Sequence, residues 1–333
     1  MGSWKKDINI VDLLLILIIL THMKLSAITK YWNDYLSEWD IDPIAKMKKE
    51  KAAGRFFAHS RTLNYNFQYM PEPYYGDTEH PYCVIIDLNP GLSHRNDCEK
   101  LHGTNGFIYQ CLHTRIDPHA KYNPCYSAVN DQYSPFLKSS IASIGTVNEI
   151  PGAAWWKDKR MEWLNSFLHR LLNITSVFPF VGQPLALELC PWHSKTWSNG
   201  IVHKMTPFLF DTVFEPAAEA IKLRNVGFGF CFGKPVGDIL LANGFKVCKI
   251  WDKNSPIGKW PLTKKGALSD RTYRLLEGLV NNDKVYFLNL YANGTFFAPG
   301  KEFKKNVEPC IIKELHSMGF PKNRKNATTK SII

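Results

Sequence analysis

The sequence lacks any pair of cysteines separated by two residues, the spacing that most cysteine metal motifs use. We therefore expect neither a zinc ribbon nor an iron–sulfur cluster, and the sequence indicates no metal and no cofactor. The chain has only 8 cysteines in 333 residues, which are too few for a disulfide scaffold. Reduced thiols in a cytoplasmic protein, or a nuclear one in a eukaryote, are the expectation.

Long hydrophobic runs are also scarce. An apolar run at residues 13–20 follows Lys5 and Lys6, an outline that is similar to a signal peptide. However, Asp12 interrupts the run on its N-terminal side, and the run is too short for a membrane span. We predict a core or partner-facing helix there and no membrane association, while secretion stays open as the alternative.

Charge of one sign is in excess. Lys and Arg number 41 against 30 Asp and Glu, giving a formal net charge of +11. Such a balance favours phosphate-rich partners such as DNA, although a well-solvated basic surface explains it equally well. Nothing in the sequence indicates an obligatory protein partner, so we expect a monomer.

Strand-like and helix-like segments alternate through most of the chain, which predicts an α/β fold. We expect three layers, α/β/α, around a mostly parallel central sheet of about four strands. The loops after Leu88, Leu189, Phe232 and Leu290 should gather at the carboxyl edge of this sheet. Strands are predicted at residues 82–86, 185–189, 226–232, 246–251 and 285–290, and helices at 163–172, 236–242 and 269–280.

Three regions follow from these patterns. Residues 1–77 form a helical and wrapping N-terminal extension, residues 78–320 form the α/β domain, and residues 321–333 form a basic tail.

The tripeptide Asn89-Pro90-Gly91 follows directly on the first predicted buried strand. Alone, it is an ordinary turn sequence. In its context, Ile85-Ile86-Asp87-Leu88-Asn89-Pro90-Gly91-Leu92-Ser93 resembles the first motif of the mismatch-specific uracil and thymine-DNA glycosylase branch, where a strand runs into Gly-x-Asn-Pro-Gly-Leu. Two weaker similarities are Asn105-Gly106-Phe107, near the spacing of an Asn-x-Phe in that branch, and the turn Gly233-Lys234-Pro235.

The resemblance implies a uracil-DNA glycosylase-like fold and a monofunctional DNA glycosylase. Such an enzyme flips a nucleotide out of DNA, hydrolyses the bond between base and sugar, and leaves an abasic site without cutting the strand. The role of positioning the attacking water carries over to Asn89. Pro90, Gly91 and Leu92 would then shape the loop that approaches the ligand.

Two residues depart from the family pattern. Asp87 stands where the family usually has glycine, and a carboxylate there serves either to activate water or to cap or pair within the loop. Glu188 stands where related enzymes carry an asparagine that reads uracil. Because a carboxylate only accepts hydrogen bonds, Glu188 suits the exocyclic amine of a cytosine-type or adenine-type base, such as a modified cytosine, better than uracil. A salt-bridged or rim glutamate is the alternative.

Further candidate residues surround this loop. Trp192 and His193 follow the second strand and are candidates for stacking on the flipped base and for stabilising the departing base. Phe107 is another candidate for stacking. For the loop that enters the duplex, the segment around Asn293 competes with the segment around Asn254, and we favour Asn293.

Two other function classes stay open. A non-catalytic DNA-binding sensor of modified DNA would keep the same fold. A metal-dependent hydrolase is suggested only by a dense set of His and Asp side chains without a recognised ligand spacing: His94, Asp97, His102, His113, Asp117 and His119. Repair of DNA and defence against modified viral DNA use the same chemistry, and the sequence does not choose between them.

Overall fold

A computed structural model describes much of the chain between residues 65 and 321, together with scattered positions between 28 and 49. The described ranges are 65–66, 73–76, 81–88, 162–174, 184–191, 193–194, 209–222, 226–257, 259–291 and 299–321.

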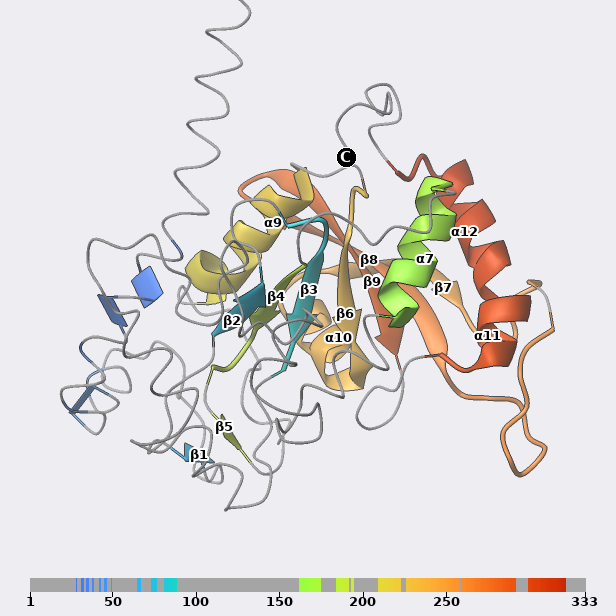
Figure 1. Ribbon diagram of the computed structural model, residues 1–333, viewed down its shortest axis with the longest axis horizontal. Coiled ribbons are helices and arrows are strands. Elements are labelled where there is room, and N and C mark those ends of the chain that lie inside the picture. The colour runs from blue at the N-terminus through green and yellow to red at the C-terminus, as the bar shows by residue number, and fades with distance from the viewer. Residues whose placement is uncertain are drawn as a thin grey trace, which may run out of the picture.

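A seven-stranded mixed sheet forms the centre of the molecule (Figure 1), with the strand order β2-β4-β3-β6-β9-β8-β7. The four adjacent strands β4, β3, β6 and β9 run parallel, while β2 and β8 lie antiparallel to their neighbours β4 and β9. The strands are β2 (Tyr74–Gly76), β3 (Val84–Asp87), β4 (Leu185–Glu188), β6 (Gly229–Phe232), β7 (Lys246–Trp251), β8 (Thr272–Val280) and β9 (Asp283–Tyr291).

The predicted α/β class is confirmed, but the predicted size of the sheet is wrong. We expected about four strands, and the sheet has seven because antiparallel strands extend the parallel part on both sides. The strand β2 is only three residues long and carries too little pattern to be recognised. It lies within residues 1–77, so the predicted N-terminal extension contributes an edge strand to the main sheet.

The predicted helix at residues 269–280 is also wrong, because Thr272–Val280 is the strand β8. A two-residue turn with positive φ at Asn281 and Asn282 joins it to β9 as a hairpin. Gly278 disfavours a helix, and a Cβ there would lie 2.4 Å from the ring of Phe245. Burial alternates along much of β8, which is the pattern of a strand with one covered face.

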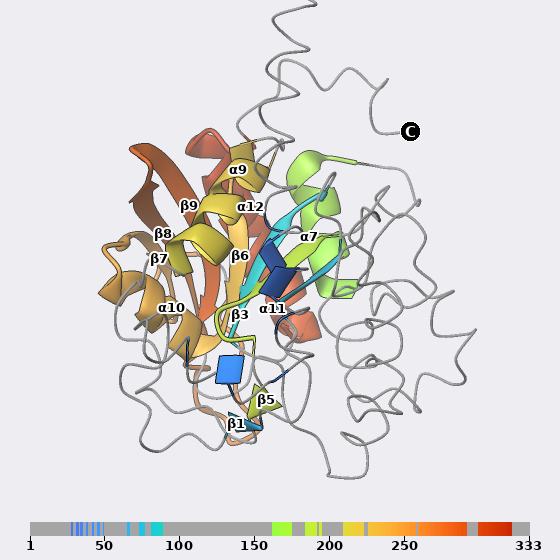
Figure 2. The same cartoon turned by 90° about the vertical axis from the view of Figure 1, so that its left-hand side faces the viewer.

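Helices cover both faces of the sheet (Figure 2). On one face, α7 (Glu162–Leu172) places Trp163 and Phe167 against Phe230 of β6, with ring centroids 6.1 and 6.0 Å apart. On the other face lie α9 (Glu215–Lys222), preceded by the π-helical turn η3 (Phe210–Phe214), and α10 (Gly233–Ala242). The C-terminal helices α11 (Lys301–Asn306) and α12 (Glu308–Ser317) pack beside α7.

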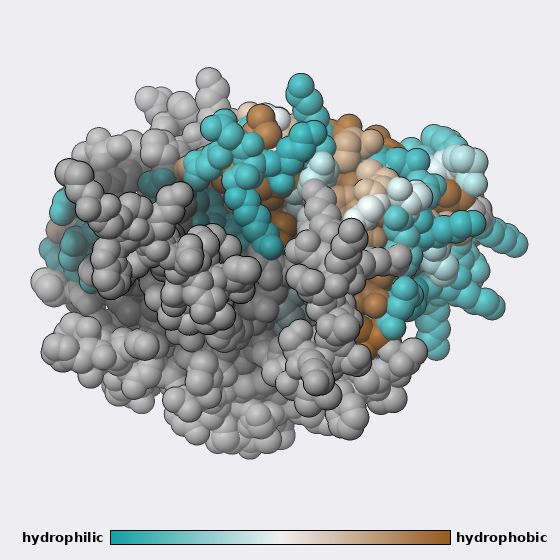
Figure 3. Space-filling model, turned by 90° about the horizontal axis from the view of Figure 1, so that it is seen from above, coloured by the Kyte–Doolittle hydropathy of each residue, from teal (hydrophilic) through white to brown (hydrophobic). Residues whose placement is uncertain are grey.

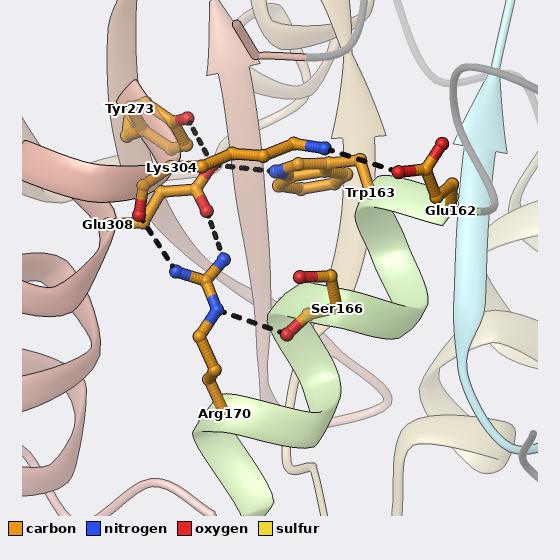
Figure 4. A network of polar contacts seen from close by, with 7 residues as sticks. All are labelled: Glu162, Trp163, Ser166, Arg170, Tyr273, Lys304 and Glu308. Carbon is orange, nitrogen blue, oxygen red and sulfur yellow. Dashed lines mark hydrogen bonds and ion pairs between the residues drawn. The ribbon is translucent and has the colours of Figure 1, made fainter. Parts of the chain in front are cut away.

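The buried carboxylate of Glu308 joins α7, α12 and β8 (Figure 4). Its Oε1 accepts hydrogen bonds from Trp163 Nε1 at 2.7 Å and from the Tyr273 hydroxyl at 3.0 Å. Arg170 donates to Oε2, and its Nη1 donates to the Lys304 carbonyl at 3.0 Å. Glu308 has no exposed surface, so this charge is tolerated only because these donors surround it.

Within the described residues, no helix combines the length and the apolar character needed to cross a bilayer. The apolar run at residues 13–20, which we predicted to be a core or partner-facing helix, lies outside them.

Candidate functional site at the carboxyl edge of the sheet

The carboxyl ends of β4, β3, β6 and β9 lie at one edge of the sheet, as we predicted from the alternating pattern. From β3 the chain crosses to β4 on one side, and it then returns past β3 to β6 and β9 on the other side. The order therefore reverses between β3 and β6. In open α/β sheets, ligands bind in the crevice outside the carboxyl ends of the strands at such a switch point.

Asp87 and Glu188 are the last residues of β3 and β4 and are partners in the parallel register. Side chains in register on neighbouring strands point to the same face, and the strands themselves lie about 4.8 Å apart. Both side chains are buried, with 7% and 5% of their surface exposed. Two candidate site residues, predicted from separate parts of the sequence, are thus brought together.

Cys231 of β6 is the third group near this point. Burial raises the pKa of the Cys231 thiol far above its usual value; a hydrogen bond with Asn289 opposes the shift, and the Asp87 carboxylate adds to it. The thiol therefore stays protonated at neutral pH. A protonated, fully buried thiol is a poor nucleophile and a poor metal ligand, so Cys231 packs and does not react.

Asn289 holds the turn that leads from β6 into α10. Its Nδ2 donates to the carbonyls of Cys231 and Gly233, both at 3.1 Å, and its side chain has no exposed surface. Gly233 has φ +82°, a conformation that favours glycine. Gly237 lets α10 approach, because a Cβ there would lie 2.4 Å from Asn289 Oδ1.

Asn289 was not among the residues predicted from the sequence. The signal that marks it is a single amide inside the apolar stretch Phe287-Leu288-Asn289-Leu290. A buried polar side chain in such a stretch needs a specific hydrogen-bond partner.

Lys234, Tyr291, Arg274 and Asp238 lie together beside this turn; we call them the cation–tyrosine cluster. The Arg274 guanidinium stacks on the Tyr291 ring at 3.5 Å from its centroid, and the Lys234 ammonium lies 5.7 Å from the same centroid. Lys234 also pairs with Asp238 at 2.9 Å. Hydrogen bonds to Asp238 and Tyr291 raise the pKa of Lys234, which is therefore charged at neutral pH.

The structure describes only part of the predicted site. His193 lies in β5 (His193–Ser194), which pairs with β1 (Tyr65–Asn66) in a small antiparallel sheet near the lower edge in Figures 1 and 2. The remaining predicted residues lie outside the described part of the chain: Asn89, Pro90, Gly91, Leu92, Phe107, Trp192 and Asn293.

The competing loop around Asn254 is described. It follows β7 at the outer margin of the sheet, so β8 and β9 separate β7 from β6. The Asn254 backbone N–H donates to Asp252 Oδ1 at 2.9 Å, and Lys253 pairs with Asp270 at 2.7 Å. These contacts close an exposed turn, and they lie away from the switch point.

No group of three or more potential metal ligands is found within the ranges that the structure describes. The histidine- and aspartate-rich segment at residues 94–119, which suggested a metal-dependent hydrolase, lies outside those ranges.

The opposite edge of the sheet carries an exposed ion pair. Seen from above, the described residues show mostly hydrophilic side chains with smaller apolar areas between them (Figure 3). Lys222 and Asp283, which form an exposed ion pair, come from the end of α9 and the start of β9. Because β9 runs parallel to β6, this pair lies at the far end of the sheet from Lys234 and Tyr291.

Comparisons of the chain with protein-family models, with curated proteins and with solved structures gave no match.

Proposed function

We propose that the protein is a monofunctional DNA glycosylase that removes a modified or mismatched base, with a modified cytosine as the favoured substrate. The observation that carries this proposal is the pair of buried carboxylates, Asp87 and Glu188, at the ends of neighbouring parallel strands. Asp87 precedes Asn89 by two residues in the chain, at the switch point of the sheet. The pair therefore stands beside the loop that resembles the glycosylase motif.

Hydrolysis of an N-glycosidic bond needs a positioned water and a group that stabilises positive charge on the sugar. In this proposal Asn89 holds the water, and the Asp87 carboxylate polarises it or supports the loop. An anionic carboxylate near the sugar also stabilises an oxocarbenium-like transition state. His193 and Trp192 assist with the leaving base.

Glu188 determines the choice of base in this account. A carboxylate accepts a hydrogen bond from the exocyclic amine of a cytosine-type base, whereas uracil presents a carbonyl at that position. Placing that carbonyl against a buried carboxylate would be costly, so Glu188 favours a base that carries an amine.

Two further features support the proposal. Four adjacent parallel strands lie between helices, which agrees with the arrangement that the resemblance implies. The net charge of +11 favours association with DNA. No lysine is adjacent to the Asn89 motif in the sequence, which fits hydrolysis by water without a covalent Schiff base.

The test is a comparison of bases freed from duplexes that contain uracil, a thymine mismatch or a modified cytosine. We expect release of the modified cytosine, an abasic site that breaks only after alkali, and no adduct trapped by borohydride. Release of uracil alone would refute the assignment of Glu188. Tight DNA binding without release of any base would instead favour the non-catalytic sensor of modified DNA.

A further inference from the structure

The cation–tyrosine cluster contains a positive charge that the described protein does not neutralise. Arg274 is half-buried on β8, and within the described part of the chain no carboxylate forms an ion pair with it. Its Nε is buried and has no hydrogen-bond acceptor there. An anion from solvent cannot reach the buried Nε, but a half-buried guanidinium without a counter-ion is costly, and an anion at its exposed side would offset that cost.

The stacking of Arg274 on Tyr291 prepares the guanidinium for such an anion. At 3.5 Å from the ring centroid, the ring covers one face of the guanidinium plane. The N–H donors lie in the guanidinium plane and not on the face that the ring covers, so the two Nη groups stay able to bind a phosphate in two places. The ring also fixes the orientation, which lowers the entropy that binding costs.

Lys234, which lies on α10, supplies the second cation of the cluster. Its side chain is 43% exposed, and it shares the Tyr291 ring with Arg274. Asp238 is the carboxylate paired with it, so the cluster carries two cations and one anion and keeps a net positive charge. Lys234 is the second residue of α10, whose first turn contains no acidic residue.

The cation–tyrosine cluster lies at the same carboxyl edge of the sheet as Asp87 and Glu188, where the backbone of a bound DNA strand would pass. Lys234 follows β6, and Tyr291 ends β9, so both stand on the β6 side of the switch point. Asp87 and Glu188 stand on the other side, on β3 and β4.

We propose that Lys234 and Arg274, held on Tyr291, bind a backbone phosphate of the DNA strand whose nucleotide enters the switch point. This inference rests on the proposed function for the choice of DNA. Asn289 contributes indirectly, since it holds the turn from which Lys234 extends.

The salt dependence of DNA binding tests this directly. We would measure the affinity for a fluorescein-labelled duplex by anisotropy over a series of NaCl concentrations, with Lys234→Gln and Arg274→Gln. Each lost phosphate contact should lower the slope of log affinity against log salt by about one, and should lower the affinity about fivefold at physiological salt. Lys222→Gln is the matched control, because it removes one charge and one exposed ion pair at the opposite end of β9. It should leave the slope unchanged.

Two further arms complete the test. Circular dichroism checks that each variant is folded. Lys234→Gln changes a half-exposed side chain, so this variant tests the inference even if Arg274→Gln does not fold. Phosphorus NMR with inorganic phosphate or a nucleoside monophosphate asks whether a small anion is the natural ligand. Unchanged DNA slopes in both variants would overturn the inference, with or without binding of the small anion. Binding needs no base release, so reduced slopes without any base release would support this site and refute the proposed enzyme.

Discussion

Asp87 and Glu188 are register partners at the carboxyl ends of two neighbouring parallel strands, and both are buried. They come from positions 101 residues apart in the sequence. The crossover from β3 to β4 brings them to the same edge of the sheet, beside the point where the strand order reverses. This arrangement places two buried carboxylates at the end of β3, which lies two residues before Asn89 in the chain.

Substitution of Glu188 by Gln should change the choice of base. The amide can donate to a carbonyl, so we expect release of a modified cytosine to fall about 10- to 100-fold relative to release of uracil. Base release from both duplexes under identical conditions measures this ratio. Glu302→Gln, at an exposed position in α11, is the control and should leave the ratio unchanged. An unchanged ratio in Glu188→Gln would mean that Glu188 does not read the base.

Substitution of Glu308 by Gln should lower the free energy of unfolding by about 2–4 kcal/mol, because Arg170 loses its charged partner and the amide must turn its NH2 group toward a donor, either Arg170 or the pair Trp163 and Tyr273. Arg170 is one-third exposed, which keeps the loss below that of a fully buried pair. Urea unfolding measures the change. A loss no larger than that of the exposed control Glu302→Gln would show that the contacts of Glu308 in Figure 4 do not stabilise the protein.

Substitution of Gly237 by Ala should destabilise the protein by about 1–3 kcal/mol, although alanine usually stabilises a helix interior. The reason is that the new Cβ would lie 2.4 Å from Asn289 Oδ1 unless the backbone or the amide shifts. In the background Asn289→Ala, the same substitution should lose this penalty. A double-mutant cycle by urea unfolding measures the coupling, and strictly additive effects would show that the two residues are not in contact.

Stability should fall at high pH in part through Tyr286. Burial, followed by a hydrogen bond with Glu277, raises the pKa of Tyr286 to about 12, compared with about 10 in an unfolded chain. The unfolded state therefore loses this proton first, so the stabilisation is complete below about pH 10 and is lost as the pH rises toward about 12. Urea unfolding of wild type and Tyr286→Phe over this window measures the difference. An equally steep fall in Tyr286→Phe would exclude a contribution from Tyr286.

The sequence predicted the parallel part of the sheet well because its strands are strongly apolar. The predicted runs at residues 185–189, 226–232 and 285–290 correspond to β4, β6 and β9. Strands buried on both faces carry a near-continuous apolar signal that does not depend on their partners. Asp87 and Glu188 were found for the same reason, since each ends such a run.

The antiparallel part was harder to predict. Thr272–Val280 contains Leu275-Leu276 and Leu279, and this spacing also fits one side of a helix. The pairing with β9 through the Asn281-Asn282 turn decides in favour of the strand. Similarly, Arg274 and Tyr291 lie on different strands, and no sequence spacing indicates that the guanidinium stacks on that ring.

The central claim is that the loop at the carboxyl edge of β3 hydrolyses a base-to-sugar bond. The most direct measurement is release of free base by wild type, Asn89→Ala and Asp87→Asn from the same modified duplex, with DNA affinity measured in parallel. We predict that Asn89→Ala binds DNA as tightly as wild type and loses base release by at least about 100-fold, and that Asp87→Asn is also impaired. Undiminished base release by Asn89→Ala would contradict the account.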